Sequence, residues 1–212
     1  MNDTNSYTQK IAADWVSSKY YDIAEKSNPF WDDNFIFFQL FRKLDLTKIV
    51  EIACGHGRHV IHYVNIAPSI TLVDINKENI EFCKNRFSEF DKIEYIVNDG
   101  THLTGISNGS ATAVICYDSM VHFELLDIAI YLKEIYRILS VGGMALLHHS
   151  NYCGNPGAEY TKNPHLRNFM SHAIFKHLAL RSNLTVLQQN ILNWGSGDEF
   201  YSSIDCLTLL AR

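Results

Sequence analysis

The residues with the clearest chemical potential form a glycine turn in the run Glu51-Ile-Ala-Cys-Gly-His-Gly57. Gly55 permits a turn conformation that a Cβ atom would penalise, and Gly57 lets the backbone come close to a ligand. A helix is expected to begin directly after this turn, so its free amide groups can bind a carboxylate or a phosphate. The third glycine of a dinucleotide fingerprint would fall at Val60, so the full Gly-x-Gly-x-x-Gly pattern is absent.

Two aspartates stand at the ends of later predicted strands. Asp74 lies about 20 residues beyond the turn, where a carboxylate can accept hydrogen bonds from both hydroxyls of a ribose. Asp99 follows the next strand, within reach of an adenine amino group. Each could instead cap a helix or a turn, which is a frequent role of aspartate. Their common position at strand ends, together with the glycine turn, favours a nucleoside site.

Histidines are the candidates for a general base, because their side chains titrate near neutral pH. His122 follows the predicted fourth strand, and the pair His148-His149 ends the fifth. Side chains alternate along a strand, so one of this pair points into the core and the other toward the ligand cleft. We predict His149 as the cleft residue, and His122 and His149 as the candidate catalytic residues. A hydrogen-bonded structural role is the alternative for each. No metal site is predicted, because no His-x-x-x-His pair has a supporting carboxylate on a clear helix.

The elements that must position these residues follow from the hydrophobic pattern. Apolar runs predict buried strands at 47–53, 69–73, 93–97, 111–117 and 144–148. Helices are expected at 58–66, 77–90 and 126–139, the last of them ended by the pair Gly142-Gly143. Such an alternation of strand and helix implies right-handed crossovers and a doubly wound parallel sheet.

The two ends of the chain show other patterns. Residues 7–43 read as helices with a break at Asn28-Pro29, and a helix near the C-terminus is expected to start at about Phe169. Two extended segments, 184–193 and 201–211, predict an antiparallel pair. The resulting domain prediction is an N-terminal helical cap over 1–45 and one domain over 46–212, with a lid insertion near 150–181.

Composition narrows the class of protein. The chain has 212 residues, of which 47% are hydrophobic and 19% are charged, as expected for a folded core rather than disorder. A net charge of −5 without a basic run disfavours binding to nucleic-acid backbones. No signal sequence or apolar run of about 18–20 residues is present, so we expect a cytoplasmic protein without a membrane partner. The five cysteines stand singly, which is typical of free thiols.

These motifs resemble those of the class I S-adenosylmethionine-dependent methyltransferases. The run from Ile49 to His59 resembles the first motif of that family, and Asn98-Asp99-Gly100 resembles its adenine-contacting motif. The run from Ala113 to Asp118 is similar to the fourth-strand motif. The run from Leu132 to Leu146 is similar to the family's helix, glycine turn and fifth strand, although the usual Pro-Gly-Gly reads Val-Gly-Gly here.

The resemblance implies a Rossmann-like α/β sheet of seven strands in the order 3-2-1-4-5-7-6, with strand 7 antiparallel. It implies S-adenosyl-L-methionine as cofactor and S-adenosyl-L-homocysteine as product. In the family, an acidic residue at the position of Glu51 orders the glycine turn, and Tyr117 lies in the segment beside the methionine portion. Tyr20 or Tyr21 is expected to bond the cofactor carboxylate or to close over the acceptor. The predicted cofactor contacts are Glu51, Ala53, Gly55, Gly57, Asp74, Ile75, Asp99, Gly100, Tyr117 and Tyr20.

The acceptor is predicted less closely than the cofactor. The N-terminal cap and the 150–181 insertion are long enough to enclose a small molecule but not a large macromolecule. The runs His148–Asn151 and Ile204–Leu209 resemble methyltransferases associated with bacterial surface-polysaccharide biosynthesis. This resemblance implies O-methylation of a sugar hydroxyl or a phosphate-type oxygen on a capsule precursor, by a monomer or a homodimer.

Several alternatives remain open at this stage. The enzyme could instead methylate a small amine, a protein or an RNA, or the chain could bind the cofactor without catalysis. Tyr117-Asp-Ser-Met120 stands where amino-group methylases of nucleic acids carry Asn-Pro-Pro-Tyr or Asp-Pro-Pro-Tyr, which disfavours that class. A NAD-dependent oxidoreductase would need the missing third glycine.

Overall fold

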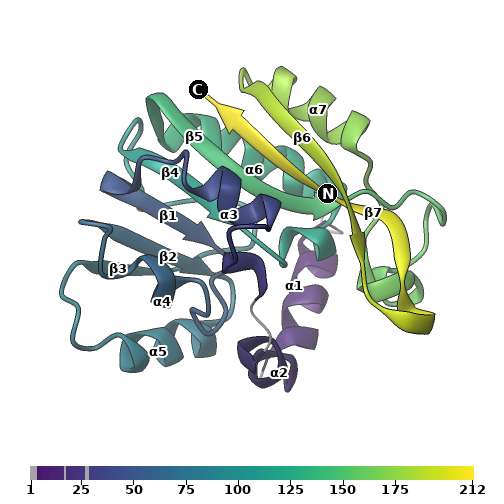
Figure 1. Ribbon diagram of the computed structural model, residues 1–212, viewed down its shortest axis with the longest axis horizontal. Helices are drawn as coiled ribbons and strands as arrows, with labels where there is room; N and C mark the ends of the chain where they lie inside the picture. The colour runs from purple at the N-terminus through teal and green to yellow at the C-terminus, as the bar shows by residue number, and fades with distance from the viewer. Residues whose placement is uncertain (1–3, 17, 27–28) are drawn as a thin grey trace.

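One mixed sheet of seven strands organises the chain, with helices on both of its faces (Figure 1). The computed structural model describes residues 4–16, 18–26 and 29–212. The strands are β1 (Ile49–Ile52), β2 (Ile70–Asp74), β3 (Ile93–Val97), β4 (Ala111–Cys116), β5 (Leu139–Ser150), β6 (Thr185–Trp194) and β7 (Tyr201–Ala211). The helices are α1 (Thr4–Trp15), α2 (Tyr20–Lys26), α3 (Ile36–Phe41), α4 (Val60–Tyr63), α5 (Lys77–Arg86), α6 (Leu125–Ile138) and α7 (His172–Arg181).

The strand order is β3-β2-β1-β4-β5-β7-β6, as predicted. Strands β1 to β5 pair in parallel, whereas β7 runs antiparallel to both β5 and β6. The central strands carry near-continuous apolar runs because helices cover both faces of the sheet. The predicted antiparallel pair near the C-terminus forms the β6–β7 hairpin at one edge, which is the yellow end of the chain in Figure 1.

Two hydrophobic cores lie on opposite faces of the sheet. One core packs α3, α4 and α5 against the strands, and the other packs α6 and α7 against them. In α6 the apolar side chains recur at helical spacing, so that Ile128, Leu132 and Ile135 are fully buried while the opposite face stays in contact with solvent. This arrangement leaves the carboxyl ends of β1 to β4 as the edge where a ligand can be held.

The glycine pair between α6 and β5 departs from the predicted turn. The helix ends at Ile138 and the strand begins at Leu139, so both glycines lie inside β5. Leu139 pairs with Ala111 and Met144 with Ala113, so β5 carries extra residues between these two pairs and bulges there. Gly142 adopts a φ of +82°, which is the left-handed conformation that glycine tolerates. The glycines therefore shape a bulge rather than a helix cap.

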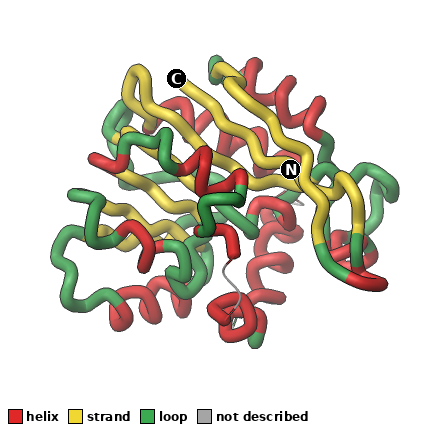
Figure 2. Tube along the Cα trace, in the orientation of Figure 1, coloured by secondary structure: helices red, strands yellow, loops and turns green. Residues whose placement is uncertain are grey.

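The N-terminal segment is more divided than the sequence predicts. In place of long helices, it contains α1, α2, a short 3-10 turn at Pro29–Trp31 and α3 (Figure 2). Asn28, one of the two residues of the predicted break, lies outside the described residues, as do residues 1–3 of the predicted cap. Near the other end, α7 begins at His172 rather than at Phe169. None of the described helices is long and apolar enough to cross a membrane.

Candidate functional site

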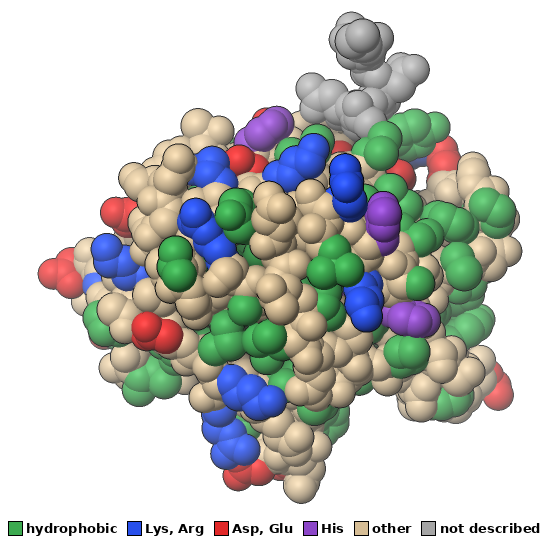
Figure 3. Space-filling model, turned by 90° about the horizontal axis from the view of Figure 1, so that it is seen from above, with side chains coloured by type: hydrophobic (Ala, Val, Ile, Leu, Met, Phe, Trp, Pro, Cys, Tyr) green, Lys and Arg blue, Asp and Glu red, His purple; other side chains and the backbone are tan. Residues whose placement is uncertain are grey.

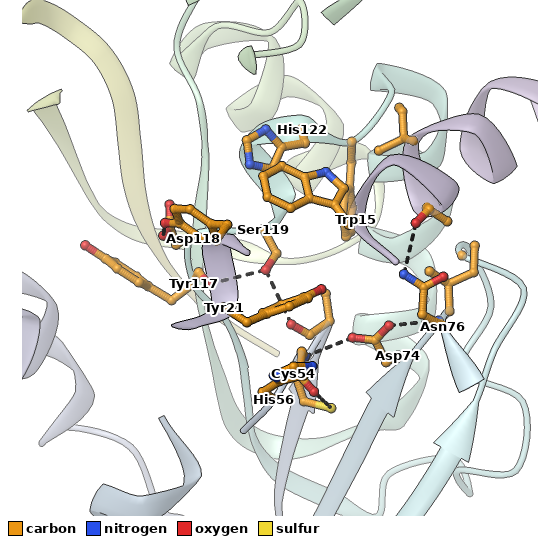
Figure 4. Close-up of a pocket in the computed structure, with 18 of the residues that line it drawn as sticks. Trp15, Tyr21, Cys54, His56, Asp74, Asn76, Tyr117, Asp118, Ser119 and His122 are labelled. Carbon is orange, nitrogen blue, oxygen red and sulfur yellow. Dashed lines mark hydrogen bonds between the residues drawn. The ribbon is translucent and has the colours of Figure 1, made fainter. Parts of the chain in front are cut away.

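A pocket opens at the carboxyl ends of β1 to β4, under α1 and α2. Its empty space, including the open mouth, is about 1000 Å³, at the upper end of the range for small-molecule sites. Apolar and aromatic side chains from α1 and α2 form the cover, and polar groups from the strand ends form the floor (Figure 4). The predicted cofactor residues that line it are Tyr20, Ala53, Gly55, Asp74, Ile75, Gly100 and Tyr117.

Asp74, at the end of β2, forms hydrogen bonds with both the glycine turn and the residues that follow β2. Its Oδ2 accepts from the amide of Gly55 at 2.9 Å, and its Oδ1 accepts from the amide of Asn76 at 2.8 Å. The Nδ2 of Asn79 also donates to Oδ1 at 3.1 Å. Burial raises the pKa of Asp74, while these donors oppose the rise. The carboxylate therefore fixes the turn and still presents acceptor lone pairs to the pocket.

Gly55 is required by the close approach of Tyr21. Its φ is +53°, and an added Cβ would lie 2.8 Å from Cε1 of the Tyr21 ring. The ring stacks on His56 with centroids 4.1 Å apart, and the Tyr21 hydroxyl accepts from Asn79 at 3.0 Å. Figure 4 shows Tyr21 crossing the pocket between the glycine turn and Trp15. The aromatic cover on the turn is thus supplied by Tyr21.

The end of β3 corrects the expectation for Asp99. Its Oδ1 accepts from the amides of Thr101 and His102, and its Oδ2 contacts the ring of His102. Although partial burial opposes this effect, those hydrogen bonds lower the pKa of Asp99 to about 2. Its side chain is about half exposed and does not line the pocket, so it caps a turn. The neighbouring Asn98 lines the pocket instead, and within the described residues its buried Oδ1 has no hydrogen-bond partner.

Glu51 and Gly57 act on the turn from outside the pocket. The Tyr63 hydroxyl donates to the carboxylate of Glu51, whose pKa is raised to about 7 by complete burial. An added Cβ at Gly57 would lie 2.5 Å from the ring of Phe87. Neither residue lines the pocket, so the structure gives both a packing position beneath the turn rather than a ligand contact.

The end of β4 brings a cation and an anion together at the pocket. Arg58 Nη2 and Asp118 Oδ2 are 2.6 Å apart, and 13% and 2% of these side chains are exposed. The Tyr20 hydroxyl also donates to Asp118. The charged pair and Tyr20 all line the pocket. The sequence predicts Tyr20 and Tyr117 here but does not single out Arg58 or Asp118, although Arg58 directly follows the glycine turn.

His122 lies at the pocket, as predicted, beside Trp15 (Figure 4). The two ring centroids are 4.8 Å apart. The Nδ1 of His122 lies 2.8 Å from the carbonyl oxygen of Leu166, so Nδ1 carries the proton of the neutral ring. No described residue hydrogen-bonds to Nε2, which therefore keeps a free lone pair. Burial lowers the pKa of His122 to about 4, so the ring is neutral near pH 7.

His149 does not line the pocket, which corrects its assignment to the cleft. It is fully buried, stacks on Phe175 with centroids 3.7 Å apart, and contacts Thr208 Oγ1 and the Ser150 carbonyl at 2.9 Å each. The side chains of His148 and His149 do alternate between the faces of β5, but both are fully buried and neither lines the pocket. His148 faces the side of Tyr117, on which its ring stacks at 4.5 Å. Periodicity alone could not decide this, because the register of β5 against β4 and β7 sets which face each histidine takes.

The burial of His149 has a measurable consequence for stability. Burial lowers its pKa to about 3, against about 6.5 in an unfolded chain. The unfolded state therefore binds the proton first, and the contribution of neutral His149 is complete above pH 6.5 and is lost as the pH falls toward 3. Between pH 7.5 and 5.5 we expect the stability advantage of the wild type over His149→Gln to shrink by about 1.4 kcal/mol. Urea denaturation at both pH values measures it, and an unchanged difference would show that His149 titrates normally in the folded protein.

The cap contributes more to the pocket than the predicted lid does. Thr8, Ile11, Ala12 and Trp15 of α1 line it, whereas no described residue of 150–181 does. That insertion instead packs beside α1, where Lys10 pairs with Glu159 at 2.8 Å.

Asp127 on α6 also lines the pocket, and its carboxylate accepts from Thr8 at 2.7 Å. Burial raises the pKa of Asp127 to about 6. Among the described residues, no group of three or more His, Cys, Asp or Glu side chains is placed to hold a metal ion.

Comparison with known proteins agrees with this geometry. Residues 49–143 match a family described as a methyltransferase domain. Over 107 residues the chain is 26% identical to "Putative methyltransferase YqeM" of Bacillus subtilis (strain 168), which covers 50% of this chain and 43% of that protein. The chain therefore matches less than half the length of this curated relative.

Solved structures share the fold at low sequence identity. Geranyl diphosphate C-methyltransferase from Streptomyces coelicolor A3(2), solved with Mg²⁺, geranyl diphosphate and S-adenosyl-L-homocysteine, is 16% identical, with 97% of each chain covered and a TM-score of 0.72. A chain from the complex of the Haloferax volcanii Trm112 methyltransferase activator with a methyltransferase is 15% identical, with 95% of this chain and 96% of that chain covered and a TM-score of 0.70. The family match covers the strands that build the pocket, and the sheet has the strand order expected of class I S-adenosylmethionine-dependent methyltransferases, so residues 49–143 form a methyltransferase domain.

Proposed function

We propose that this chain transfers a methyl group from S-adenosylmethionine to an oxygen of a small polar acceptor. The observation that carries the proposal is the pocket at the ends of β1 to β4, in which Asp74 holds the glycine turn at Gly55. Ligand sites of open α/β sheets lie at this edge.

The residues present fit the cofactor at both of its ends. Asp74 offers carboxylate oxygens to the ribose hydroxyls, and Asn98 offers an unpartnered buried carbonyl oxygen to the adenine amino group. A buried acceptor without a partner is costly, so a donor from a ligand would satisfy Asn98. Gly100 lines the same end of the pocket and lets α1 come close to it, because an added Cβ there would lie 2.5 Å from Thr8. At the other end, the glycine turn would hold the methionine portion under Tyr21.

The bound cofactor would supply a methyl group already activated by its sulfonium charge. The chain's own residues must then hold the acceptor oxygen in line with that methyl group and exclude water. A hydroxyl must also lose its proton, and His122 Nε2 is the free base at the pocket. The hydrogen bond from Nδ1 to the Leu166 carbonyl fixes both the tautomer and the ring orientation.

The enclosure of the pocket supports a small acceptor. Trp15, Tyr20 and Tyr21 cover it from α1 and α2, which favours a small acceptor over a long polymer. On the face shown in Figure 3, the Lys and Arg side chains are dispersed among apolar and acidic ones, which does not favour a nucleic-acid backbone. A sugar hydroxyl or a phosphate-type oxygen is the proposed nucleophile, and a small amine is the alternative.

The variant His122→Asn tests the proposed base. Asparagine retains a donor near the Nδ1 position and removes the Nε2 lone pair. We expect turnover of a hydroxyl acceptor to fall by roughly 10²- to 10⁴-fold, with the Kd of S-adenosylhomocysteine changed less than about threefold. Release of S-adenosylhomocysteine from S-adenosylmethionine is measured against panels of sugars, phosphate esters and small amines.

Four outcomes decide the proposal. Methylation of a sugar or phosphate ester that depends on His122 supports it. Unchanged turnover in His122→Asn removes the histidine from the mechanism, and activity confined to amines replaces O-methylation by N-methylation. Binding of S-adenosylhomocysteine to the wild type without turnover on any panel would indicate a cofactor-binding protein.

A further inference from the structure

We propose that His148 is a positioning residue that acts through Asp118 and Tyr20 to hold α2 closed over the cofactor pocket. The inference rests on the proposed function only in taking this pocket as the cofactor site. His148 does not line the pocket and is fully buried. It would therefore act on the ligand only through the residues that it places.

The contact between His148 and Asp118 is made by the backbone. The amide of Asp118 donates to His148 Nδ1 at 3.1 Å. Asp118 has a φ of +58°, a conformation that side chains other than glycine rarely adopt. Such a conformation persists only where the surroundings enforce it. An acceptor at Nδ1 gives the turned amide its partner and so stabilises the conformation.

The hydrogen bond at Nδ1 sets the tautomer of the ring. Because Nδ1 accepts, the proton of the neutral ring is on Nε2, which lies 3.2 Å from Asp205 Oδ2 but forms no hydrogen bond with any described residue. Asp205 is held in turn by Arg167, whose Nε and Nη2 donate to its two oxygens at 2.8 and 2.6 Å. All three side chains are nearly or fully buried. The fork from Arg167 thus keeps the carboxylate where it favours the Nε2–H tautomer.

Asp118 transmits this placement to the pocket. Its Oδ2 pairs with Arg58, which follows the glycine turn, and it accepts from the hydroxyl of Tyr20, the first residue of α2. Tyr20 also packs edge-on against Trp15 of α1, with centroids 5.5 Å apart. One carboxylate therefore links the strand edge, the glycine turn and the cover. If Asp118 relaxes from its left-handed conformation, the anchor of α2 moves with it.

The neighbouring His149 supplies a matched control. It is equally buried on the same strand and has contacts of similar length, but it stacks on Phe175 of α7, whereas His148 stacks on Tyr117. A purely structural role would make the effects of substituting the two histidines alike. A positioning role predicts a change at α2 only for His148.

Two variants of similar shape test the two ring nitrogens of His148 separately. His148→Asn keeps an acceptor at the Nδ1 position and loses the Nε2 contact, whereas His148→Gln keeps a donor at the Nε2 position and loses the acceptor. The readouts are amide hydrogen exchange of residues 20–26 in the ligand-free protein and the dissociation rate of S-adenosylhomocysteine by stopped flow. We expect His148→Gln to speed both by roughly tenfold, the size of one lost hydrogen bond. His148→Asn and His149→Gln should stay within about threefold of the wild type.

Tyr20→Phe tests the other end of the same connection and leaves the sheet intact. It should also speed exchange of α2, and adding it to His148→Gln should add little, because both changes break one path. Equal exchange in His148→Gln and the wild type, additive effects of the two changes, or equal effects of His149→Gln would each overturn the inference. If His148→Gln does not fold, an unchanged α2 exchange rate in Tyr20→Phe overturns it. If the wild type does not bind S-adenosylhomocysteine, the proposed function fails, while the ligand-free exchange rates still decide the role of His148.

Discussion

Replacing Asp74 with alanine is expected to weaken binding of S-adenosylhomocysteine by roughly ten- to a hundredfold. The loss corresponds to about 1.5–3 kcal/mol, the size of hydrogen bonds to a charged acceptor. Asp74 also holds the amides of Gly55 and Asn76, so its removal frees the glycine turn as well as the ribose site. Isothermal titration calorimetry measures the change directly.

Asp99→Ala is the matched control for this prediction. Asp99 also stands at a strand end and carries a carboxylate, but its oxygens are bonded within the turn 99–102 and it does not line the pocket. We expect the affinity of Asp99→Ala for S-adenosylhomocysteine to stay within about threefold of the wild type. An Asp99 variant that loses as much affinity as the Asp74 variant would return the adenine contact to Asp99. Unchanged affinity in Asp74→Ala would argue against the ribose assignment.

Replacing Asp205 with alanine is expected to lower the free energy of unfolding by about 3–5 kcal/mol. The substitution leaves the guanidinium of Arg167 buried without its anion, and such uncompensated charges are strongly destabilising. Although burial opposes it, the contacts of Asp205 with His148 and Arg167 hold the pKa of Asp205 below its usual value. The contribution of the ionised carboxylate is therefore present above the unfolded carboxyl pKa, about 3.9, and is lost as the pH falls below it.

Urea denaturation at pH 7 measures this loss, and a double variant separates its two causes. Arg167→Met combined with Asp205→Leu removes both charges and fills similar volume, so it should recover most of the stability lost in the single variant. A double variant as unstable as Asp205→Ala would mean that packing around β7, rather than the buried charge, explains the loss.

The fold follows from the sequence wherever the hydrophobic periodicity and the residues that end an element agree. The run 93–97 matches β3 in the structure because an apolar strand is bounded there by polar residues. The glycine pair at 142–143 was interpreted wrongly, because glycine ends helices and also permits bulges, and the local sequence is the same in both cases. Strand order came from the resemblance to a family, since pairing between distant strands leaves no local signal.

The candidate site is predicted in part, for physical reasons that differ by residue. Asp74 and Gly55 could be placed together at the pocket because the backbone at a strand end sets their positions, and their contacts with the cofactor stay predictions. Asn98 and Asp99 are neighbours at one strand end, and only the turn that Asp99 caps decides which side chain faces the pocket. Trp15 reaches the pocket through the packing of α1, which the spacing of apolar residues cannot orient.

Because of the bulge, the number of residues in β5 can change without changing which of its side chains face each side of the sheet. Side chains of a strand alternate between faces, so a shift of one residue beyond the bulge would exchange His148 and His149. Val141, at the bulge, is 91% exposed, and an added Cβ at Gly142 would meet nothing within 4 Å. Insertions and deletions can therefore be absorbed there without disturbing the core. The functional identity of each histidine is thus a property of the register of Met144–Ser150 against β4 and β7, and not of the imidazole ring itself.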